Sequence, residues 1–241
     1  MTSPIIYTKI PGTDPGLVAA AAEAGVADLH EALGALSGMT QLMGPRMRPL
    51  DMRARIAGPA VTVMTWPSDN LMMHKALDMA EAGQVLVITN GGSARGALWG
   101  ELAAVAAQRK RIAGVVTDAA VRDTSALLAM GFPVWSTAIH ASHGEKRGPG
   151  AVNVPIVIDG VVVNPGDIIV ADSDGVLAVP RQSLADAVKG AQQRRAKEAG
   201  MKERLAAGGS LLELLGLDKV VAATGIAIRE TSWEEDQKGG R

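Results

Sequence analysis

Three charged side chains, Glu101, Arg122 and Asp123, have the types and spacing from which a catalytic site can be built. Glu101 is followed by residues 102–121 and then by the Arg122-Asp123 pair. Arginine can bind a carboxylate through two parallel hydrogen bonds, which lysine cannot do. Aspartate and glutamate are hard oxygen donors that suit Mg²⁺ or Mn²⁺ better than zinc. These residues therefore predict a site for a carboxylate ligand beside a divalent cation.

Each of these residues also has a purely structural explanation. Asp123 could serve only as the N-terminal cap of a helix, and Arg122 could form only a surface ion pair. Glu101, near the start of a predicted helix, is favoured there by the helix macrodipole alone. Residue types by themselves do not decide between the structural and the functional interpretation.

The elements expected around these residues bring two loops together. Helices are predicted over 71–82, from about 98 to 108 and from Asp123 to Met130, and apolar strands over 56–65, 84–89, 114–118 and 133–136. This alternation is typical of parallel strands joined by right-handed crossovers, which bind ligands outside the carboxyl ends of the strands. Loops 90–97 and 118–123 should therefore meet, with unpaired helix N–H groups that attract anions.

The other segments indicate a mixed α/β protein. A helix is predicted over 15–37, and Asp-Gly pairs at 159–160 and 174–175 indicate antiparallel hairpins within 152–179. A long helix is predicted over 182–206, followed by a Gly-rich stretch and an acidic tail that we expect to fray. We predict one domain over residues 1–241, with a core at about 25–205 and a C-terminal tail at about 208–241.

Composition excludes several classes of protein. The 241 residues contain no cysteine, which removes disulfides, thiolate nucleophiles and iron–sulfur clusters. A net charge of −1 and 2% aromatic residues argue against a nucleic-acid or membrane-surface partner. We see no signal peptide and no apolar run of the ~18–20 residues that a membrane span needs. We therefore expect a cytoplasmic protein with a small-molecule ligand.

An ordered series of motifs carries a resemblance to a known family. An acidic residue, twenty intervening residues and Arg-Asp are present as Glu101 and Arg122-Asp123. The flanking motifs lie between about residues 25 and 205: Ile56-Ala-Gly-Pro-Ala-Val-Thr-Val63, Asp69-Asn70 with His74, Asp118, Phe132-Pro-Val-Trp-Ser136, Val152-Asn-Val-Pro155, Asn164-Pro-Gly-Asp167, Asp174-Gly-Val176 and Val179-Pro-Arg181. This series resembles the RraA-like family, and within it the class II pyruvate aldolases acting on 4-hydroxy-4-methyl-2-oxoglutarate and 4-carboxy-4-hydroxy-2-oxoadipate.

The resemblance implies a fold and an assembly. The fold is a layered β/β/α arrangement of the swivelling type, with a parallel βα core, antiparallel hairpins and flanking N- and C-terminal helices. Members form homotrimers or homohexamers, in which a Glu from the long C-terminal helix of a neighbouring subunit reaches the site. In this sequence that residue is best matched by Glu198, within Arg194-Arg-Ala-Lys-Glu198.

The resemblance also implies a role for each site residue. Asp123 binds the divalent metal, Mg²⁺ or Mn²⁺, directly, and Glu101 binds it through water. Arg122 contacts the pyruvyl oxygens of the substrate. The substrate carboxylate binds at the start of the helix, at Gly100, Leu102 and Ala103.

The reaction implied is metal-dependent retro-aldol cleavage of a 4-hydroxy-2-oxo acid to pyruvate and a second keto acid, with breakdown of aromatic compounds as its usual setting. Because the same enolate forms when oxaloacetate loses CO₂, oxaloacetate decarboxylation is an expected side activity. A Schiff-base mechanism is disfavoured, because no Lys lies in an apolar strand-like run. The alternative function is a non-catalytic RraA-like regulator that binds and inhibits a ribonuclease.

Other polar motifs receive structural interpretations. His140 and His143 have a two-His metal spacing without a third ligand nearby, so we predict a loop or rim role for them. His74 is expected to form structural hydrogen bonds. Residues 172–175 resemble the start of a calcium loop but lack its Glu, so we predict a turn. We predict a role in packing or at an interface for three methionines: Met39, Met43 and Met47.

Overall fold

The computed structural model describes residues 4–37 and 40–239. The chain divides into two compact units, Met1–Arg194 and Arg195–Arg241, and each is described by itself. The predicted extent of a single domain over 1–241 stays a prediction. The elements of the first unit, the last of which continues into the second, are β1 Ile5–Ile6, α1 Pro15–Ser37, β2 Arg48–Pro49, β3 Ile56–Thr65, α2 Leu71–Met79, β4 Val85–Thr89, α3 Glu101–Arg109, β5 Gly114–Val121, α4 Thr124–Met130, β6 Val134–Ile139, β7 Gly150–Val152, β8 Ile156–Ile158, β9 Val161–Val163, β10 Ile168–Ala171, β11 Val176–Val179 and α5 Leu184–Ala206.

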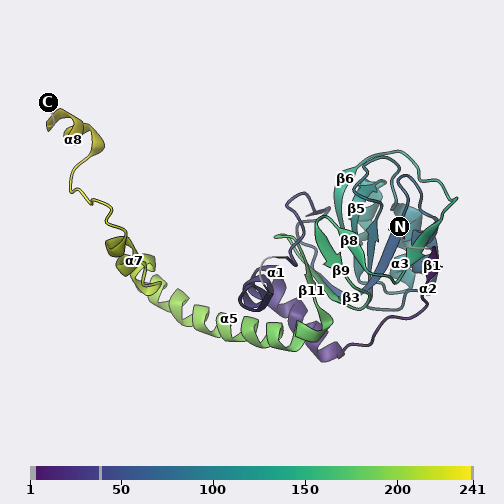
Figure 1. Cartoon of the computed structure of the whole chain (residues 1–241), viewed down its shortest axis with the longest axis horizontal. Coiled ribbons are helices and arrows are strands. Elements are labelled where there is room, and N and C mark those ends of the chain that lie inside the picture. The colour runs from purple at the N-terminus through teal and green to yellow at the C-terminus, as the bar shows by residue number, and fades with distance from the viewer. Residues whose placement is uncertain (1–3, 38–39, 240–241) are drawn as a thin grey trace. The chain divides into compact units, whose positions relative to one another are not determined.

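A central sheet with the order β1-β7-β3-β4-β5-β6-β2 organises the first unit (Figure 1). The pairs β3–β4, β4–β5 and β5–β6 are parallel, as the alternation of strands and helices predicts. Strand β7 is antiparallel to β3, and β2 is antiparallel to β6. Strand β10 is antiparallel to both β3 and β11, so it attaches the β10–β11 hairpin to β3. The predicted mixed α/β fold with antiparallel hairpins is therefore confirmed.

The buried side chains form layers on the two faces of this sheet. Helices α2, α3 and α4 cover one face, where Leu86, Val115 and Val134 belong to one apolar cluster. The β8–β9 hairpin covers the other face over Val87 and Val116 (Figure 1). Strands β4 and β5 are apolar along their length because both of their faces are covered.

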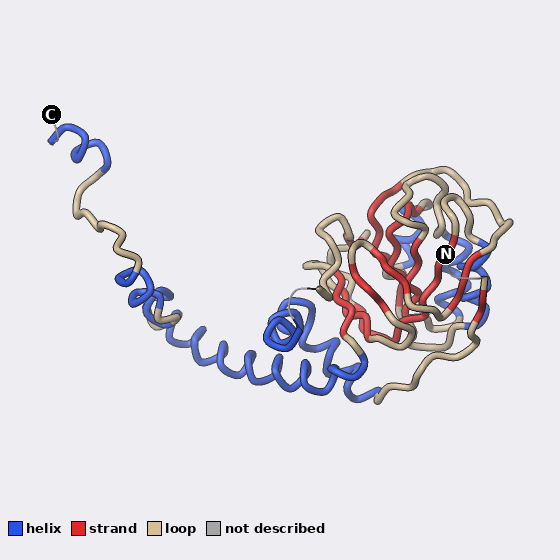
Figure 2. Tube along the Cα trace, viewed as in Figure 1, coloured by secondary structure: helices blue, strands red, loops and turns tan. Residues whose placement is uncertain are grey.

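A third apolar cluster joins α1, the β10–β11 hairpin and the first turns of α5 (Figure 2). Leu29 and Leu33 of α1 are fully buried there against Leu177, Val179 and Leu184. This cluster confirms that N- and C-terminal helices flank the sheet of the first unit.

Two boundaries at the carboxyl edge of the sheet differ from the sequence prediction. Strand β5 continues to Val121, beyond the predicted end at residue 118, and α3 begins at Glu101, after the predicted start at about residue 98. Both differences have one cause, because residues 98–100 run beside the end of β5. The Leu98 N–H donates to the Ala120 carbonyl at 2.9 Å, and Trp99 forms a parallel bridge with Val121.

Helix α1 is interrupted at Gly25, where the prediction of one continuous helix over 15–37 is wrong. Gly25 has φ 81° and ψ 176°, which are not helical values. The Val26 N–H donates to Asp172 Oδ2 at 3.0 Å, so a carboxylate from another part of the chain caps the second half of the helix. The same carboxylate accepts the Asp174 N–H through Oδ1, which confirms the predicted turn at 172–175.

Replacing Gly25 by alanine should destabilise the first unit without affecting the sheet edge. An L-residue pays a steric penalty at this positive φ, and a Cβ would also lie 3.1 Å from Asp172 Oδ2. We expect a loss of about 1–2 kcal/mol in the free energy of unfolding. Urea denaturation followed by circular dichroism measures it; Gly34→Ala, where a Cβ meets no atom within 4 Å, is the matched control. Equal stability of the two variants would contradict this explanation.

The second unit is helical where the sequence predicts a frayed tail. Besides the end of α5 it contains α6 Leu211–Leu214, α7 Leu217–Ala223 and α8 Trp233–Gly239. Gly216, with φ 67°, separates α6 from α7 in a conformation that glycine adopts readily. The correction follows from local sequence, since 211–223 contains five leucines and leucine favours helix. None of the helices in the described parts of the chain could cross a membrane.

Candidate active site

The ends of three neighbouring extended segments form the candidate site. Val121, the last residue of β5, is bridged to Trp99 on one side and paired with Ile139 of β6 on the other. The Arg122 N–H donates to the Trp99 carbonyl at 3.0 Å. Trp99 is buried, and its ring stacks on Phe132 with centroids 5.7 Å apart. The pairing of the chain thus places Gly100 and the start of α3 beside Arg122.

Asp123 turns its carboxylate back toward α3. Its backbone is left-handed, with φ 55° and ψ 36°, and its side chain makes no capping bond to its own helix α4. Instead, Asp123 Oδ2 accepts the Glu101 N–H at 3.2 Å and lies 3.6 Å from Arg122 Nε. The interpretation of Asp123 as only the cap of the helix that follows it is therefore wrong. The structure brings Glu101, Arg122 and Asp123 together, as the spacing predicts.

Gly100 is the residue around which these groups approach one another. Its φ of −164° is extended backbone, so conformation alone does not require glycine. A Cβ on Gly100 would lie 2.6 Å from Asp123 Oδ2, 3.2 Å from Arg122 Cγ and 3.4 Å from Arg122 Nε. Glycine is needed here because a side chain would occupy the space in which the carboxylate and the guanidinium meet.

Replacing Gly100 by alanine should therefore displace Asp123 and Arg122 while the fold persists. We expect catalytic efficiency to fall by about 10- to 100-fold, the scale of a displacement of about 1 Å in a reacting geometry. The measurement is kcat/KM for pyruvate release together with the thermal unfolding midpoint. Gly34→Ala is the control, because a Cβ there meets no atom within 4 Å and φ is not positive. Unchanged activity in Gly100→Ala would show that the close approach is irrelevant to function.

The start of α3 offers backbone donors beside Arg122. The first N–H groups of a helix have no acceptor within it, and the Glu101 N–H is already bonded to Asp123. Within the described part of the chain, no acceptor is bonded to the N–H of Leu102 or Ala103. Partial positive charge at this end of α3 adds to the charge of Arg122. The arrangement can bind a carboxylate through amide donors and a guanidinium.

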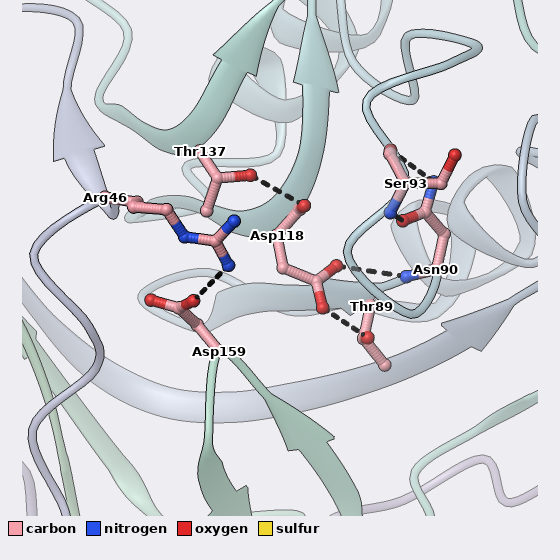
Figure 3. Close-up of polar contacts among 7 residues, drawn as sticks. All are labelled: Arg46, Thr89, Asn90, Ser93, Asp118, Thr137 and Asp159. Atoms are coloured by element: carbon pink, nitrogen blue, oxygen red, sulfur yellow. Dashed lines mark hydrogen bonds and ion pairs between the residues drawn. The ribbon is translucent and has the colours of Figure 1, made fainter.

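Asp118 was part of a motif in the sequence but had no assigned role, and the structure gives it one. Asp118 Oδ2 accepts from Thr89 Oγ1 at 2.7 Å and Oδ1 accepts the Asn90 N–H at 3.1 Å, as Figure 3 shows. Asn90 in turn bonds Ser93 through both its amide oxygen and its amide nitrogen. The buried carboxylate thereby ties loop 90–93 to the end of β5. In the sequence, the available signal for this role is a single carboxylate within an apolar strand run.

Burial is the main cause of a raised pKa at Asp118. The hydrogen bonds from Thr89, Asn90 and the Gly92 N–H oppose this shift, while the charge of Asp159 adds to it. Asp159, in the turn of the β8–β9 hairpin, is paired with Arg46 at 2.9 Å (Figure 3). The Asp118 backbone carbonyl accepts from Thr137 Oγ1 at 2.7 Å, which joins β5 to β6 at the same level.

Loop 140–149 forms a rim beside loop 90–97. Ser142 accepts the Gly96 N–H through Oγ at 2.8 Å and the Ala97 N–H through its carbonyl at 3.0 Å. Asp69 holds the far end of the rim, since its Oδ2 accepts the N–H groups of Arg147 and Gly148. Burial would raise the pKa of Asp69, but these bonds and the Leu71 N–H outweigh it and lower the pKa.

The other predicted residues have varied positions. Glu198 lies in the second unit, so its role in the site stays a prediction. Burial, and next the charge of Lys146, lower the pKa of His74. Met43 and Met47 are buried in the core, which confirms packing, whereas Met39 is outside the described residues.

The donor set suits a hard divalent cation. Within the described ranges, no group of three or more His, Asp or Glu side chains is arranged to hold a metal. Glu101 and Asp123 are adjacent, because the Asp123 carboxylate accepts the Glu101 N–H. Both residues are exposed, so each has carboxylate oxygen atoms open to solvent. Mg²⁺ is commonly held by one or two carboxylates while it keeps several waters and contacts its substrate. These two carboxylates fit that mode of binding.

Comparison with known proteins identifies the family of this chain and several named relatives. Residues 26–178 match the family model described as RraA-like, aldolase/RraA. A protein of Halalkalibacterium halodurans named "Putative 4-hydroxy-4-methyl-2-oxoglutarate aldolase" is 36% identical over 164 residues, which cover 68% of this chain and 78% of that protein. An aldolase activity thus figures in the names of several curated relatives.

Two solved structures carry names from RNA processing. Streptomyces coelicolor RraAS2, described as an unusual member of the RNase ES inhibitor RraA family, matches with a TM-score of 0.73 and 26% identity over 80% of this chain and all of that chain. The RNA-processing inhibitor RraA of Thermus thermophilis matches with a TM-score of 0.57 and 36% identity over 63% of this chain and 92% of that one. The fold and the family are therefore shared, and the names of these relatives include an aldolase and two RNA-processing inhibitors.

Proposed function

Because the chain belongs to the RraA-like family, which contains both aldolases and RraA proteins, we propose that it is a divalent-metal-dependent lyase. Its substrate is a 4-hydroxy-2-oxo di- or tricarboxylic acid, such as 4-hydroxy-4-methyl-2-oxoglutarate or 4-carboxy-4-hydroxy-2-oxoadipate. The products are pyruvate and a second keto acid. The observation that carries this proposal is the meeting of Arg122, Asp123 and the open start of α3 around Gly100.

The pyruvyl end of the substrate binds at the start of α3. Its carboxylate accepts hydrogen bonds from the N–H groups of Leu102 and Ala103, and Arg122 binds an adjacent pyruvyl oxygen. Arg122 and Asp123 have side chains that are each 41% exposed, so both are open to a ligand from solvent. Binding at this end fixes the substrate with its scissile C3–C4 bond near the carboxylates.

Cleavage breaks the C3–C4 bond and transfers one proton. The C4 hydroxyl loses its proton, C4 becomes a carbonyl carbon as the C3–C4 bond breaks, and the electron pair of that bond forms the pyruvate enolate. Arg122 stabilises the negative charge that develops on the enolate oxygen, which is where a catalytic interaction has the greatest effect. In this proposal Glu101 holds the departing proton, which then returns to C3 and completes pyruvate.

Asp123 and Glu101 would hold the metal, Asp123 directly and Glu101 through water. When bound, Mg²⁺ or Mn²⁺ supplies Lewis-acid stabilisation of negative charge at the keto and enolate oxygens. Oxaloacetate decarboxylation is proposed as a side activity, because loss of CO₂ leaves the same enolate.

The proposal includes a homotrimer or homohexamer in which Glu198 of the partner subunit completes the site. Large apolar side chains on α3 and α4 are exposed and support burial against another chain: Leu102 at 85%, Val105 at 50% and Leu128 at 47%. Sedimentation velocity measures the assembly, and a fully active monomer would contradict this part of the proposal.

The alternative is a non-catalytic regulator that inhibits a ribonuclease, which is the function in the names of the two solved relatives. The test is pyruvate release, coupled to lactate dehydrogenase, from the methyl-oxoglutarate, the carboxy-oxoadipate and oxaloacetate in the presence of Mg²⁺. We expect turnover of at least one 4-hydroxy-2-oxo acid. Absence of turnover on all three, together with inhibition of RNA cleavage by ribonuclease E, would favour the regulator.

A further inference from the structure

His140 occupies the position next to Arg122 at the carboxyl edge of the sheet. Trp99 is bridged to Val121, and Val121 is paired with Ile139. The His140 N–H donates to the Val121 carbonyl at 3.0 Å. Adjacent strands lie about 4.8 Å apart. One residue beyond this pairing, Gly100, Arg122 and His140 therefore follow one another across three neighbouring segments.

The surroundings of the ring determine which nitrogen carries its proton. The Ser142 N–H donates to His140 Nδ1 at 3.2 Å, so Nδ1 acts as an acceptor. Ser142 Oγ lies 2.7 Å from the same nitrogen and itself accepts the Gly96 N–H at 2.8 Å. The Ser142 hydroxyl proton is therefore free to point at Nδ1. With Nδ1 accepting two hydrogen bonds, the neutral ring has its proton on Nε2.

Among residues 4–37 and 40–239, nothing accepts a hydrogen bond from the Nε2–H of His140. His140 is itself exposed. Ser142 anchors the ring to loop 90–97, which leads through residues 98–100 to the start of α3. The backbone pairing thus places His140 on the side of Arg122 that lies away from Gly100.

We propose that His140 is a specificity-determining residue that binds the part of the substrate beyond the scissile bond. This inference rests on the proposed function, in which Arg122 and the start of α3 bind the pyruvyl end. A substrate that extends past Arg122, along the line from Gly100 through Arg122 to His140, brings its C4 substituents toward His140. The Nε2–H donates a hydrogen bond to the carboxylate on C4, which is retained in the second keto acid after cleavage.

The test compares two reactions that differ at this carboxylate. Oxaloacetate releases its outer carboxyl as CO₂ and has no further carboxylate on the departing carbon. His140→Ala should therefore lower kcat/KM for 4-hydroxy-4-methyl-2-oxoglutarate by about 10- to 100-fold, as expected for one hydrogen bond to a charged group. Oxaloacetate decarboxylation should stay within about twofold of wild type. His140→Gln, which retains an N–H donor, should lose less than His140→Ala.

His143→Ala is the matched control, because it removes an exposed imidazole from the same loop. It should leave both reactions and the thermal unfolding midpoint unchanged. Equal losses on the two reactions in His140→Ala, or losses in His140→Gln as large as in His140→Ala, would overturn the proposal while leaving the aldolase function intact. A wild-type protein that turns over neither oxaloacetate nor either 4-hydroxy-2-oxo acid would instead overturn the function and this inference with it.

Discussion

Replacing Asp123 by asparagine should lower kcat/KM for pyruvate release by about 10²- to 10³-fold, the effect of removing one preorganised charge from an active site. Asparagine keeps the size of the side chain and an oxygen that can accept the Glu101 N–H, which Asp123 Oδ2 accepts at 3.2 Å. What it removes is the negative charge available to a divalent cation. The loss should therefore appear with an unchanged fold.

Two further measurements separate this explanation from a structural role of Asp123. Isothermal titration with Mn²⁺ should show weaker binding in Asp123→Asn than in wild type. The thermal unfolding midpoint should shift little, because the Asp123 side chain is 41% exposed and does not cap its own helix. Asp78→Asn is the control, since Asp78 forms an exposed pair with Lys75 on α2. Wild-type activity and Mn²⁺ affinity in Asp123→Asn would exclude Asp123 as a ligand.

Replacing Arg122 by lysine should lower kcat/KM by about 10²-fold even though the positive charge is kept. A lysine ammonium cannot reproduce the fork of parallel donors with which a guanidinium binds oxygen atoms. If Arg122 stabilises the enolate oxygen, kcat should fall along with kcat/KM; if it only binds the ground state, KM alone should rise. Steady-state kinetics over a range of substrate concentrations distinguishes these two results.

Arg53→Lys is the matched control for this change. Arg53 is 91% exposed and pairs with Asp51 at 3.0 Å, outside the candidate site. It should behave as wild type in the same assay. Arg122→Lys with wild-type kcat and KM would contradict any role for the guanidinium in substrate binding.

Much of the sheet could be predicted because its strands are encoded locally. The apolar run at 56–65 forms β3 with the predicted bounds, and the run at 84–89 forms β4 from Val85 to Thr89. These strands are buried on both faces, so their hydrophobic character continues without alternation. The convergence of Glu101 with Arg122 and Asp123 follows from the same pattern, because parallel strands bring their carboxyl ends to one edge.

What could not be predicted depends on partners distant in sequence. The break in α1 at Gly25 accompanies a capping bond to Val26 from Asp172. The sequence prediction ends β5 at Asp118 because this residue is polar. In the structure the strand continues, because the Asp118 carboxylate accepts hydrogen bonds from Thr89 and Asn90. Such long-range hydrogen bonds leave no mark on local periodicity.

Metal dependence of pyruvate release would show whether Asp123 serves a divalent cation in catalysis. The protein is treated with EDTA, desalted, and assayed for pyruvate release from 4-hydroxy-4-methyl-2-oxoglutarate before and after addition of Mg²⁺ or Mn²⁺. We expect negligible turnover in the chelated protein, recovery on adding either ion to wild type, and little recovery in Asp123→Asn. Full turnover after chelation, or equal recovery in wild type and Asp123→Asn, would contradict this expectation.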